Sequence, residues 1–248
     1  MLTNPTMQNL RTLRLSGMLK ALEEQLQMKD IQEFSFEDRL GLLVDAEIIA
    51  RGNKQLQTRL KSAKLRLSSC IEDIDMKNGR GLDKTNLVSL STCDWLKLHR
   101  NLVVTGPTGS GKTFIACAVA QKACREGFTV HYQRASKLFH DLALGKADGR
   151  YLKILADIAK KDLLVIDDFA LAPLIDEQRR DLLEIFEDRY NRRSTIVVSQ
   201  VPSDNWHEII GDPTIADAIL DRLIHNAHKI QLRTKVSKRK EEHPDLEF

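Results

Sequence analysis

The stretch Asn101-Leu-Val-Val-Thr-Gly-Pro-Thr-Gly-Ser-Gly-Lys-Thr113 decides the fold of this chain. Its first five residues form a largely apolar run, and the next eight match the spacing G-x-x-x-x-G-K-S/T of a loop that holds nucleotide phosphates. Glycine tolerates the positive φ angles that turn backbone N–H groups inward around an anion, and the helix expected after the loop adds its positive N-terminal end. We therefore predict a strand, a phosphate loop and a helix in succession, and with them a site for a nucleoside triphosphate.

The loop and a second motif supply the residues expected to carry the chemistry. Lys112 is placed to reach the β- and γ-phosphates, and the Thr113 hydroxyl to coordinate Mg²⁺. The second motif, Leu163-Leu-Val-Ile-Asp-Asp-Phe169, delivers two carboxylates at the end of an apolar run. Because open α/β sheets bind ligands at the carboxyl ends of their strands, we expect Asp167 to hold Mg²⁺ and Asp168 to orient or deprotonate the attacking water. The nucleotide-binding residues predicted from the loop are Gly106, Pro107, Thr108, Gly109, Ser110, Gly111, Lys112 and Thr113.

Two later positions are further candidates. Ser199 and Gln200 end the run that begins at Thr195, where either side chain is placed to contact the γ-phosphate or the water, although ordinary strands also end in polar residues. Arg222 lies among apolar residues on an expected helix. It is a candidate for an arginine that stabilises the transition state in a neighbouring subunit, and pairing with Asp217 or Asp221 is the structural alternative.

Charge is unevenly distributed along the chain. The net charge of the 248 residues is only +3, yet the segments 51–66 and 229–240 each hold six Lys or Arg and no acid. Such blocks favour a polyanion as partner. The first block gives the DNA-binding candidates Arg51, Lys54, Arg59, Lys61, Lys64 and Arg66.

Composition excludes several classes of protein. No stretch reaches the about 18 apolar residues of a membrane span, and Arg11, Arg14 and Lys20 interrupt the N-terminal leucines where a signal peptide needs an apolar core. The four cysteines and seven histidines show no metal-ligand spacing. We therefore expect a cytoplasmic protein without a membrane partner, whose metal ligands are Thr113 and Asp167.

The order of elements predicts an α/β core behind a helical region. From Trp95 onward, apolar runs alternate with longer helical patterns, which indicates a five-stranded parallel sheet with helices on both faces. The runs are 101–105, 129–133, 163–167, 195–199 and 229–232. We expect a small all-helical domain for DNA binding or oligomerisation at 1–75, a linker at 76–94, the nucleotide-binding core at 95–232 and a basic tail at 233–248.

Taken together, these motifs resemble the IstB/DnaC family, a branch of the AAA+ ATPases. The resemblance covers the phosphate loop, the run 163–169, Ser194-Thr-Ile-Val-Val-Ser-Gln-Val-Pro202 with Trp206, and Ala218-Ile-Leu-Asp-Arg-Leu-Ile-His-Asn-Ala-His228. The segment Leu10-Arg-Thr-Leu-Arg-Leu-Ser-Gly-Met-Leu-Lys-Ala-Leu22 is similar to the helical N-terminal domain of IstB-type proteins.

The resemblance implies an ATP-dependent helper of transposition that assembles on duplex DNA as an ATP-bound homo-oligomer, distorts the DNA and stimulates a transposase. By motif, Lys112 and Thr113 form Walker A, Asp167 and Asp168 form Walker B, Ser199 and Gln200 correspond to sensor I, and Arg222 to the arginine finger. Many AAA+ proteins have Glu where Asp168 stands, so slow basal hydrolysis is expected.

The end of the chain departs from the family pattern. IstB relatives often carry a Gly-Glu-Ser-x-Arg-like sequence after the last strand, whereas this chain has Arg233-Thr-Lys-Val-Ser-Lys-Arg239, which leaves a sensor-II arginine open. We expect the helical lid domain to be absent or vestigial, so that a neighbouring subunit and the N-terminal helices close over the nucleotide.

Three other readings remain. A DnaC-like loader of a replicative helicase would bind single strands. A GTPase should carry Asn-Lys-x-Asp after the loop, and a small-molecule kinase an Arg-rich lid after the Asp pair; neither is evident. A module that binds nucleotide without turnover is disfavoured by the intact Asp167-Asp168 pair.

Overall fold

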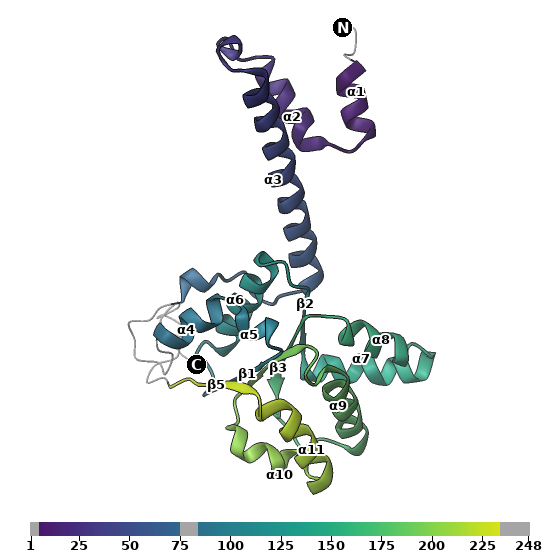
Figure 1. Cartoon of the computed structure of the whole chain (residues 1–248). Helices are drawn as coiled ribbons and strands as arrows, with labels where there is room; N and C mark the ends of the chain where they lie inside the picture. The colour runs from purple at the N-terminus through teal and green to yellow at the C-terminus, as the bar shows by residue number, and fades with distance from the viewer. Residues whose placement is uncertain (1–4, 75–83, 234–248) are drawn as a thin grey trace, which may run out of the picture. The chain divides into compact units, whose positions relative to one another are not determined.

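The apolar runs from Asn101 onward form one parallel sheet, with the strand that leads into the phosphate loop inside it (Figure 1). The strand order is β2-β3-β4-β1-β5, and every neighbouring pair of strands is parallel. The strands are β1 (Asn101–Thr105), β2 (Val130–Arg134), β3 (Leu163–Phe169), β4 (Ser194–Ser199) and β5 (Ala227–Gln231). The predicted five-stranded parallel sheet is confirmed.

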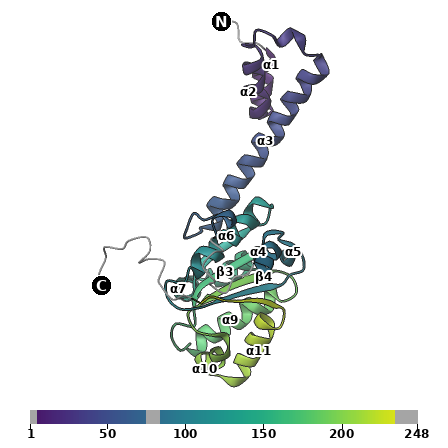
Figure 2. The ribbon, with the colours of Figure 1, turned by 90° about the vertical axis from the view of Figure 1, so that its left-hand side faces the viewer.

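Helices cover both faces of this sheet (Figure 2). One face carries α6 (Lys112–Arg125), with α4 (Lys84–Ser91) packed beside it. The main core lies on the other face, where apolar side chains of four helices meet those of β1, β3 and β4. These helices are α7 (Ala135–Asp148), α8 (Tyr151–Ala159), α9 (Asp176–Arg189) and α11 (Pro213–Ile224), and the short α10 (Trp206–Ile210) packs against α11.

Burial on both faces explains why the strands read as continuous apolar runs. All residues of β1 and β4 are buried, and so are all of β3 except Asp168. Helices on both faces leave no face of these three strands to water, so their polar residues are confined to the strand ends. The ends of β1, β3 and β4 therefore carry the polar side chains that the site needs.

The computed structural model describes residues 5–74 and 84–233, and the chain divides into two units between Thr58 and Arg59. The first unit contains α1 (Pro5–Thr12), α2 (Ser16–Gln25), the 3₁₀ turn η1 (Ile31–Glu33) and most of α3 (Phe36–Ala63). Glu47 of α3 accepts hydrogen bonds from the backbone N–H groups of Gly17 (2.7 Å) and Met18 (3.2 Å) at the start of α2. A Cβ at Gly17 would lie 2.4 Å from the Ala46 carbonyl oxygen, so only glycine permits this close crossing of the two helices.

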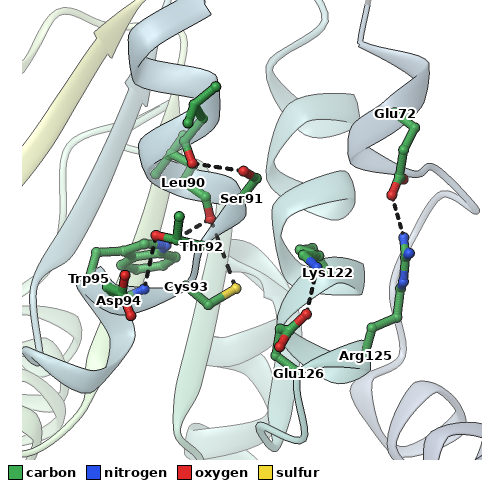
Figure 3. A network of polar contacts seen from close by, with 11 residues as sticks. Glu72, Leu90, Ser91, Thr92, Cys93, Asp94, Trp95, Lys122, Arg125 and Glu126 are labelled. Carbon is green, nitrogen blue, oxygen red and sulfur yellow. Dashed lines mark hydrogen bonds and ion pairs between the residues drawn. The ribbon is translucent and has the colours of Figure 1, made fainter.

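The 3₁₀ turn η2 (Ile71–Asp73) and α4 pack on α6, and α5 (Asp94–Lys97) packs on α4. Figure 3 shows these contacts: Arg125 of α6 pairs with Glu72 at 2.7 Å, and the Trp95 indole donates to the Leu90 carbonyl at 3.3 Å. The predicted linker 76–94 therefore contains α4 and the first residue of α5, while 76–83 lie outside the described residues. The predicted basic tail also lies outside them, apart from Arg233. Within the described part of the chain, no helix is both long and apolar enough to span a membrane.

Candidate nucleotide site

The phosphate loop connects the end of β1 to the start of α6, as its sequence predicts. Gly106 has φ 150° and a Cβ there would lie 2.7 Å from the Leu232 carbonyl oxygen, so the loop needs glycine at its first position. Gly111 has φ 91° and is the N-cap of α6, which points the helix start into the loop. The N-terminal end of a helix and the inward N–H groups of such a loop make an anion site.

Lys112 is buried at the first position of α6, and its ammonium donates to the Pro107 carbonyl at 2.8 Å. The Lys112 side chain therefore reaches back to the loop that precedes α6. On the other side of the loop, the Thr108 hydroxyl donates to the Gln200 amide oxygen at 2.6 Å. The structure thus brings Gln200 of the β4 end onto the phosphate loop.

Asp167 is the centre of the site. It is fully buried at the end of β3, and its Oδ2 accepts hydrogen bonds from the Thr113 hydroxyl at 2.9 Å and from the Tyr132 hydroxyl at 2.6 Å. Its Oδ1 accepts from the backbone N–H of Asp168 at 2.8 Å. The hydroxyl and the carboxylate predicted to hold Mg²⁺ therefore touch one another, although 54 residues separate them in the chain.

Asp168 follows in a strained conformation beside a cation. Its φ of 57° lies in the left-handed region that costs most residues about 1 kcal/mol or more. Nη1 of Arg66 lies 3.7 Å from Oδ2 of Asp168 and 3.9 Å from Oδ2 of Asp167. Burial opposes the charged form of Arg66, but contacts with Tyr132 and the two carboxylates outweigh it and raise the pKa of Arg66.

Ser199 occupies a different position from Gln200. Its hydroxyl is buried, donates to the Phe169 carbonyl at 2.7 Å and accepts from the backbone N–H of Val201 at 3.1 Å. Ser199 therefore ties the ends of β3 and β4 together. Of the two residues predicted for this strand end, the structure brings Gln200 to the loop and engages Ser199 in holding the strands.

Arg222 is remote from the phosphate loop of its own chain. Its carbonyl accepts from the Asn101 side chain at 3.0 Å, so Arg222 lies at the start of β1, whereas the loop follows the end of β1. Its guanidinium contacts Glu187, donates to the Ala218 carbonyl at 2.9 Å and lies over the Tyr190 ring. Arg222 therefore pairs with Glu187, whereas the sequence suggests Asp217 or Asp221 as its structural partner.

The six cations of the first basic block, predicted to bind DNA, differ in their surroundings. The division of the chain puts Arg51 and Lys54 in the first unit and the other four residues in the second. Three of the six have protein partners: Arg51 pairs with Glu47 at 2.7 Å, Arg59 donates to the Cys124 carbonyl at 2.9 Å, and Arg66 faces the Asp167-Asp168 pair. The structure therefore places the guanidinium of Arg66, which the sequence predicts to contact DNA, beside the Asp167-Asp168 pair. Lys54, Lys61 and Lys64 are exposed.

Tyr132 is the site residue that sequence reasoning missed. It lies on β2, opposite Val165 of β3, and burial together with its hydrogen bond to Asp167 raises the pKa of its phenol. Only the adjacency of β2 and β3 brings the hydroxyl to Asp167, and a single sequence does not specify that adjacency. Among the described residues, no three His, Cys, Asp or Glu side chains gather as metal ligands.

Solved structures share this fold. The DnaC helicase loader aligns with a TM-score of 0.58 at 20% identity, over 69% of this chain and all of that one. The replication initiator DnaA bound to AMPPCP and single-stranded DNA aligns with the same TM-score at 15% identity, over 73% of this chain and 56% of that one. At these identities the likeness establishes the fold alone.

Sequence relatives define the family. A Sinorhizobium fredii protein, y4pL, named for ATP binding in an insertion sequence, is 48% identical over 94% of this chain and 95% of its own length. A Pseudomonas fluorescens protein, named for ATP binding in the insertion sequence IS1162, is 44% identical over 82% of this chain and 88% of its own. Residues 8–244 match the family described as IstB-like ATP binding protein. A phosphate loop whose Thr113 contacts a buried Asp167 is the nucleotide site expected of such a protein, and this chain belongs to the IstB-like ATP-binding family.

Proposed function

We propose that this protein is an ATPase that assembles on duplex DNA in an ATP-dependent manner, remodels the DNA, and thereby assists a transposase in target-site selection and transposition. The observation that carries the proposal is the contact of Thr113 with Asp167 beneath the phosphate loop, in a chain whose relatives are named for ATP binding in insertion sequences. This contact supports nucleotide binding, and the names of the relatives support a role on DNA.

The side chains fit Mg²⁺ and ATP. Mg²⁺ prefers hard oxygen ligands and takes few of them from protein, completing its shell with phosphate and water. The Thr113 hydroxyl and the Asp167 carboxylate, 2.9 Å apart, supply such oxygens. When bound, the ion neutralises charge on the phosphates. Lys112 would leave the Pro107 carbonyl for the β- and γ-phosphates, and Asp168, which is partly exposed, would orient or deprotonate the attacking water.

Arg222 is proposed to act on the nucleotide of a neighbouring copy. Its position at the start of β1 prevents it from reaching the loop of its own chain, which begins after Thr105. An arginine supplied to a neighbour's phosphates stabilises the charge of the transition state and is worth about 10³-fold or more in rate. Release from Glu187 would free the guanidinium for that contact.

The assembly step can be tested by separating binding from turnover. Lys112→Ala should abolish ATP-dependent assembly on duplex DNA, because the loop loses its phosphate-binding cation. Asp168→Asn should assemble on DNA but not hydrolyse ATP, because the hydrogen bonds at Asp167 remain and the base is lost. Electron microscopy and light scattering on duplex DNA, with ATP or a non-hydrolysable analogue, measure both. Equal amounts of DNA-bound oligomer with and without ATP would count decisively against the proposal.

The role of Arg222 has a complementation test. Arg222→Ala has an intact loop but no arginine to give, and Asp168→Asn has an intact arginine but no base. Arg222→Ala alone should hydrolyse ATP slowly and Asp168→Asn alone should not hydrolyse it, whereas a mixture should recover activity because Arg222 of the Asp168→Asn copy acts on the nucleotide of the Arg222→Ala copy. Recovery should be greatest near equal amounts. A mixture no faster than the two variants measured separately would refute action between copies.

The DNA contacts are proposed to come from the exposed lysines of the basic block, Lys54, Lys61 and Lys64. Each phosphate contact contributes about 0.9 to the slope of log affinity against log salt for duplex DNA, so replacing all three by alanine should lower that slope by up to about 3 per protomer. Arg59→Ala is the matched control, because Arg59 is engaged by the Cys124 carbonyl. An unchanged slope in the triple variant would show that these three lysines do not contact DNA phosphates.

The same measurements distinguish the helicase-loader alternative. Bending a site of about 20–30 base pairs costs a few kcal/mol, so a remodelling protein must hold duplex DNA through several protomers. Preference for duplex DNA and retention of an integrase-type transposase support the proposal. Preference for single strands and retention of a ring-shaped replicative helicase would replace it with the loader.

A further inference from the structure

Arg66 is a cation placed against the carboxylate pair of the nucleotide site. The two carboxylates of Asp167 and Asp168 follow one another in the chain, and Oδ2 of each lies within 4 Å of the same Arg66 nitrogen, at 3.9 and 3.7 Å. Neighbouring like charges repel one another, most strongly where one of them is buried as Asp167 is. A cation at this position offsets part of that repulsion.

The backbone that carries Arg66 is fixed to α6, the helix that begins in the phosphate loop. Lys64, at φ 53°, takes the left-handed conformation that ends α3 and turns the chain toward α6. Before this turn the Arg59 guanidinium donates to the Cys124 carbonyl of α6 at 2.9 Å, and after it the Ser69 hydroxyl donates to the Phe114 carbonyl of α6 at 3.1 Å. The Arg66 guanidinium is therefore delivered to the carboxylates by a segment that is anchored on both sides of it.

The contact itself is long enough to be exchanged. At 3.7–3.9 Å the guanidinium balances charge without a short hydrogen bond to either carboxylate, and the Arg66 side chain remains 43% exposed. The direct hydrogen bonds to Oδ2 of Asp167 come instead from Thr113 and Tyr132. Arg66 can thus swing toward solvent while its backbone stays on α6.

We propose that Arg66 is a positioning residue that holds the Asp167-Asp168 pair in the nucleotide-free protein, in place of the divalent cation, and yields the pair when Mg·ATP binds. The inference rests on the proposed use of Asp167 as a Mg²⁺ ligand. Without nucleotide, a metal ion meets two carboxylates and Arg66, whose three charges sum to −1. A metal ion that arrives with ATP is also bound by the phosphates, and this binding offsets the loss of the contact between Arg66 and the carboxylates. Arg66 therefore couples metal binding to nucleotide binding.

The test measures metal binding without nucleotide, by electron paramagnetic resonance of Mn²⁺ added to the full chain. Removing a charge about 4 Å from the pair should tighten Mn²⁺ binding by about fivefold or more, after allowance for the partial exposure of Arg66. Arg66→Ala and Arg66→Gln should both show this gain. Arg66→Lys should stay within about twofold of the wild type because the charge remains. Arg180→Ala, which removes an exposed arginine of α9, is the matched control and should leave Mn²⁺ affinity unchanged.

Several outcomes would overturn the inference. Equal Mn²⁺ binding by wild type, Arg66→Ala and Arg66→Gln, including undetectable binding to all three, would show that the guanidinium does not screen the pair. A gain in Arg66→Lys as large as in Arg66→Ala would show that charge is not the cause. If the wild type hydrolyses ATP but the Arg66 variants bind Mn²⁺ as it does, this inference alone fails. If the variants bind Mn²⁺ more tightly but the wild type hydrolyses no ATP, the proposed function fails and the role of Arg66 stands.

Discussion

Replacing Tyr132 by phenylalanine removes one hydrogen bond to the buried Asp167 carboxylate, together with the contact of the same hydroxyl with Arg66. The hydroxyl lies 2.6 Å from Oδ2 of Asp167, and both side chains are buried, so water cannot readily take its place. Hydrogen bonds to charged groups contribute about 1.5–3 kcal/mol to the free energy of unfolding. At about 2–4 °C per kcal/mol for a chain of this size, Tyr132→Phe should lower the melting temperature by about 3–12 °C.

Tryptophan fluorescence isolates the relevant transition. The chain has two tryptophans, Trp95 and Trp206, both buried and both in the unit that begins at Arg59, so their emission follows the unfolding of that unit alone. Trp206 also packs edge to face on Phe169, the residue after Asp168, with ring centroids 4.9 Å apart. A thermal melt followed at the tryptophan emission therefore reports the unit that contains Asp167.

Tyr151→Phe is the matched control, because the Tyr151 hydroxyl donates to another buried carboxylate, that of Asp181, at 2.9 Å. Tyr151 is only partly buried and Asp181 also pairs with Lys146 at 2.7 Å, so water and the ammonium compensate for the lost donor. We expect a smaller decrease in melting temperature than for Tyr132→Phe. A Tyr132→Phe protein that melts within about 1 °C of the wild type would refute the view that this hydroxyl holds Asp167.

Three further changes probe other contacts. Gly106→Ala should cost about 1–3 kcal/mol and weaken binding of a fluorescent ATP analogue, because its Cβ would meet the Leu232 carbonyl at 2.7 Å; unchanged affinity would contradict this. Arg189→Met should cost about 3 kcal/mol or more in urea unfolding, since the buried guanidinium serves Thr195 and the carbonyls of Ile158, Lys161 and Ser194; a loss under about 1 kcal/mol would contradict it. The hydrogen bond from Arg51 lowers the pKa of Glu47 below its usual 4.5, against the opposing effect of burial. The stabilisation that ionised Glu47 gives the fold is therefore complete above pH 4.5 and is lost as the pH falls through the lower pKa of the folded state. Circular dichroism should show that Glu47→Gln loses less helix on acidification than the wild type does. Equal losses of helix would refute this contribution of Glu47.

Local patterns in the sequence were sufficient to predict the core. The central strands β1, β3 and β4 are apolar runs because both of their faces are covered, and the spacing of the phosphate loop is typical of a nucleotide-binding loop between a strand and a helix. Lys112, Thr113 and Asp167 could be placed for the same reason: a strand end or a helix start determines where they point. Gly106 and Gly111 follow from the backbone that the loop requires.

The rest depends on contacts between distant segments. Arg66 belongs to a run of cations that the sequence does not distinguish from one another, and its contact with the two carboxylates depends on the turn at Lys64 and on the packing against α6. Tyr132 reaches Asp167 because β2 is the neighbour of β3, and strand order is a property of the whole sheet. Charge density along a sequence therefore does not specify which cation of a basic run contacts a carboxylate of the same chain.

The two ends of β1 give the subunit a polarity. One end leads into the phosphate loop, and the other holds the backbone of Arg222 through the Asn101 side chain. Copies that shared nucleotides in the proposed way would join head to tail, each giving an arginine at one side and receiving one at the other, which closes into a ring or extends as a helical filament. In an open filament the subunit at one end would hold a nucleotide that is not contacted by Arg222 of a neighbour. Hydrolysis would then cease at that terminus, and the direction of growth would distinguish the two ends of the bound DNA.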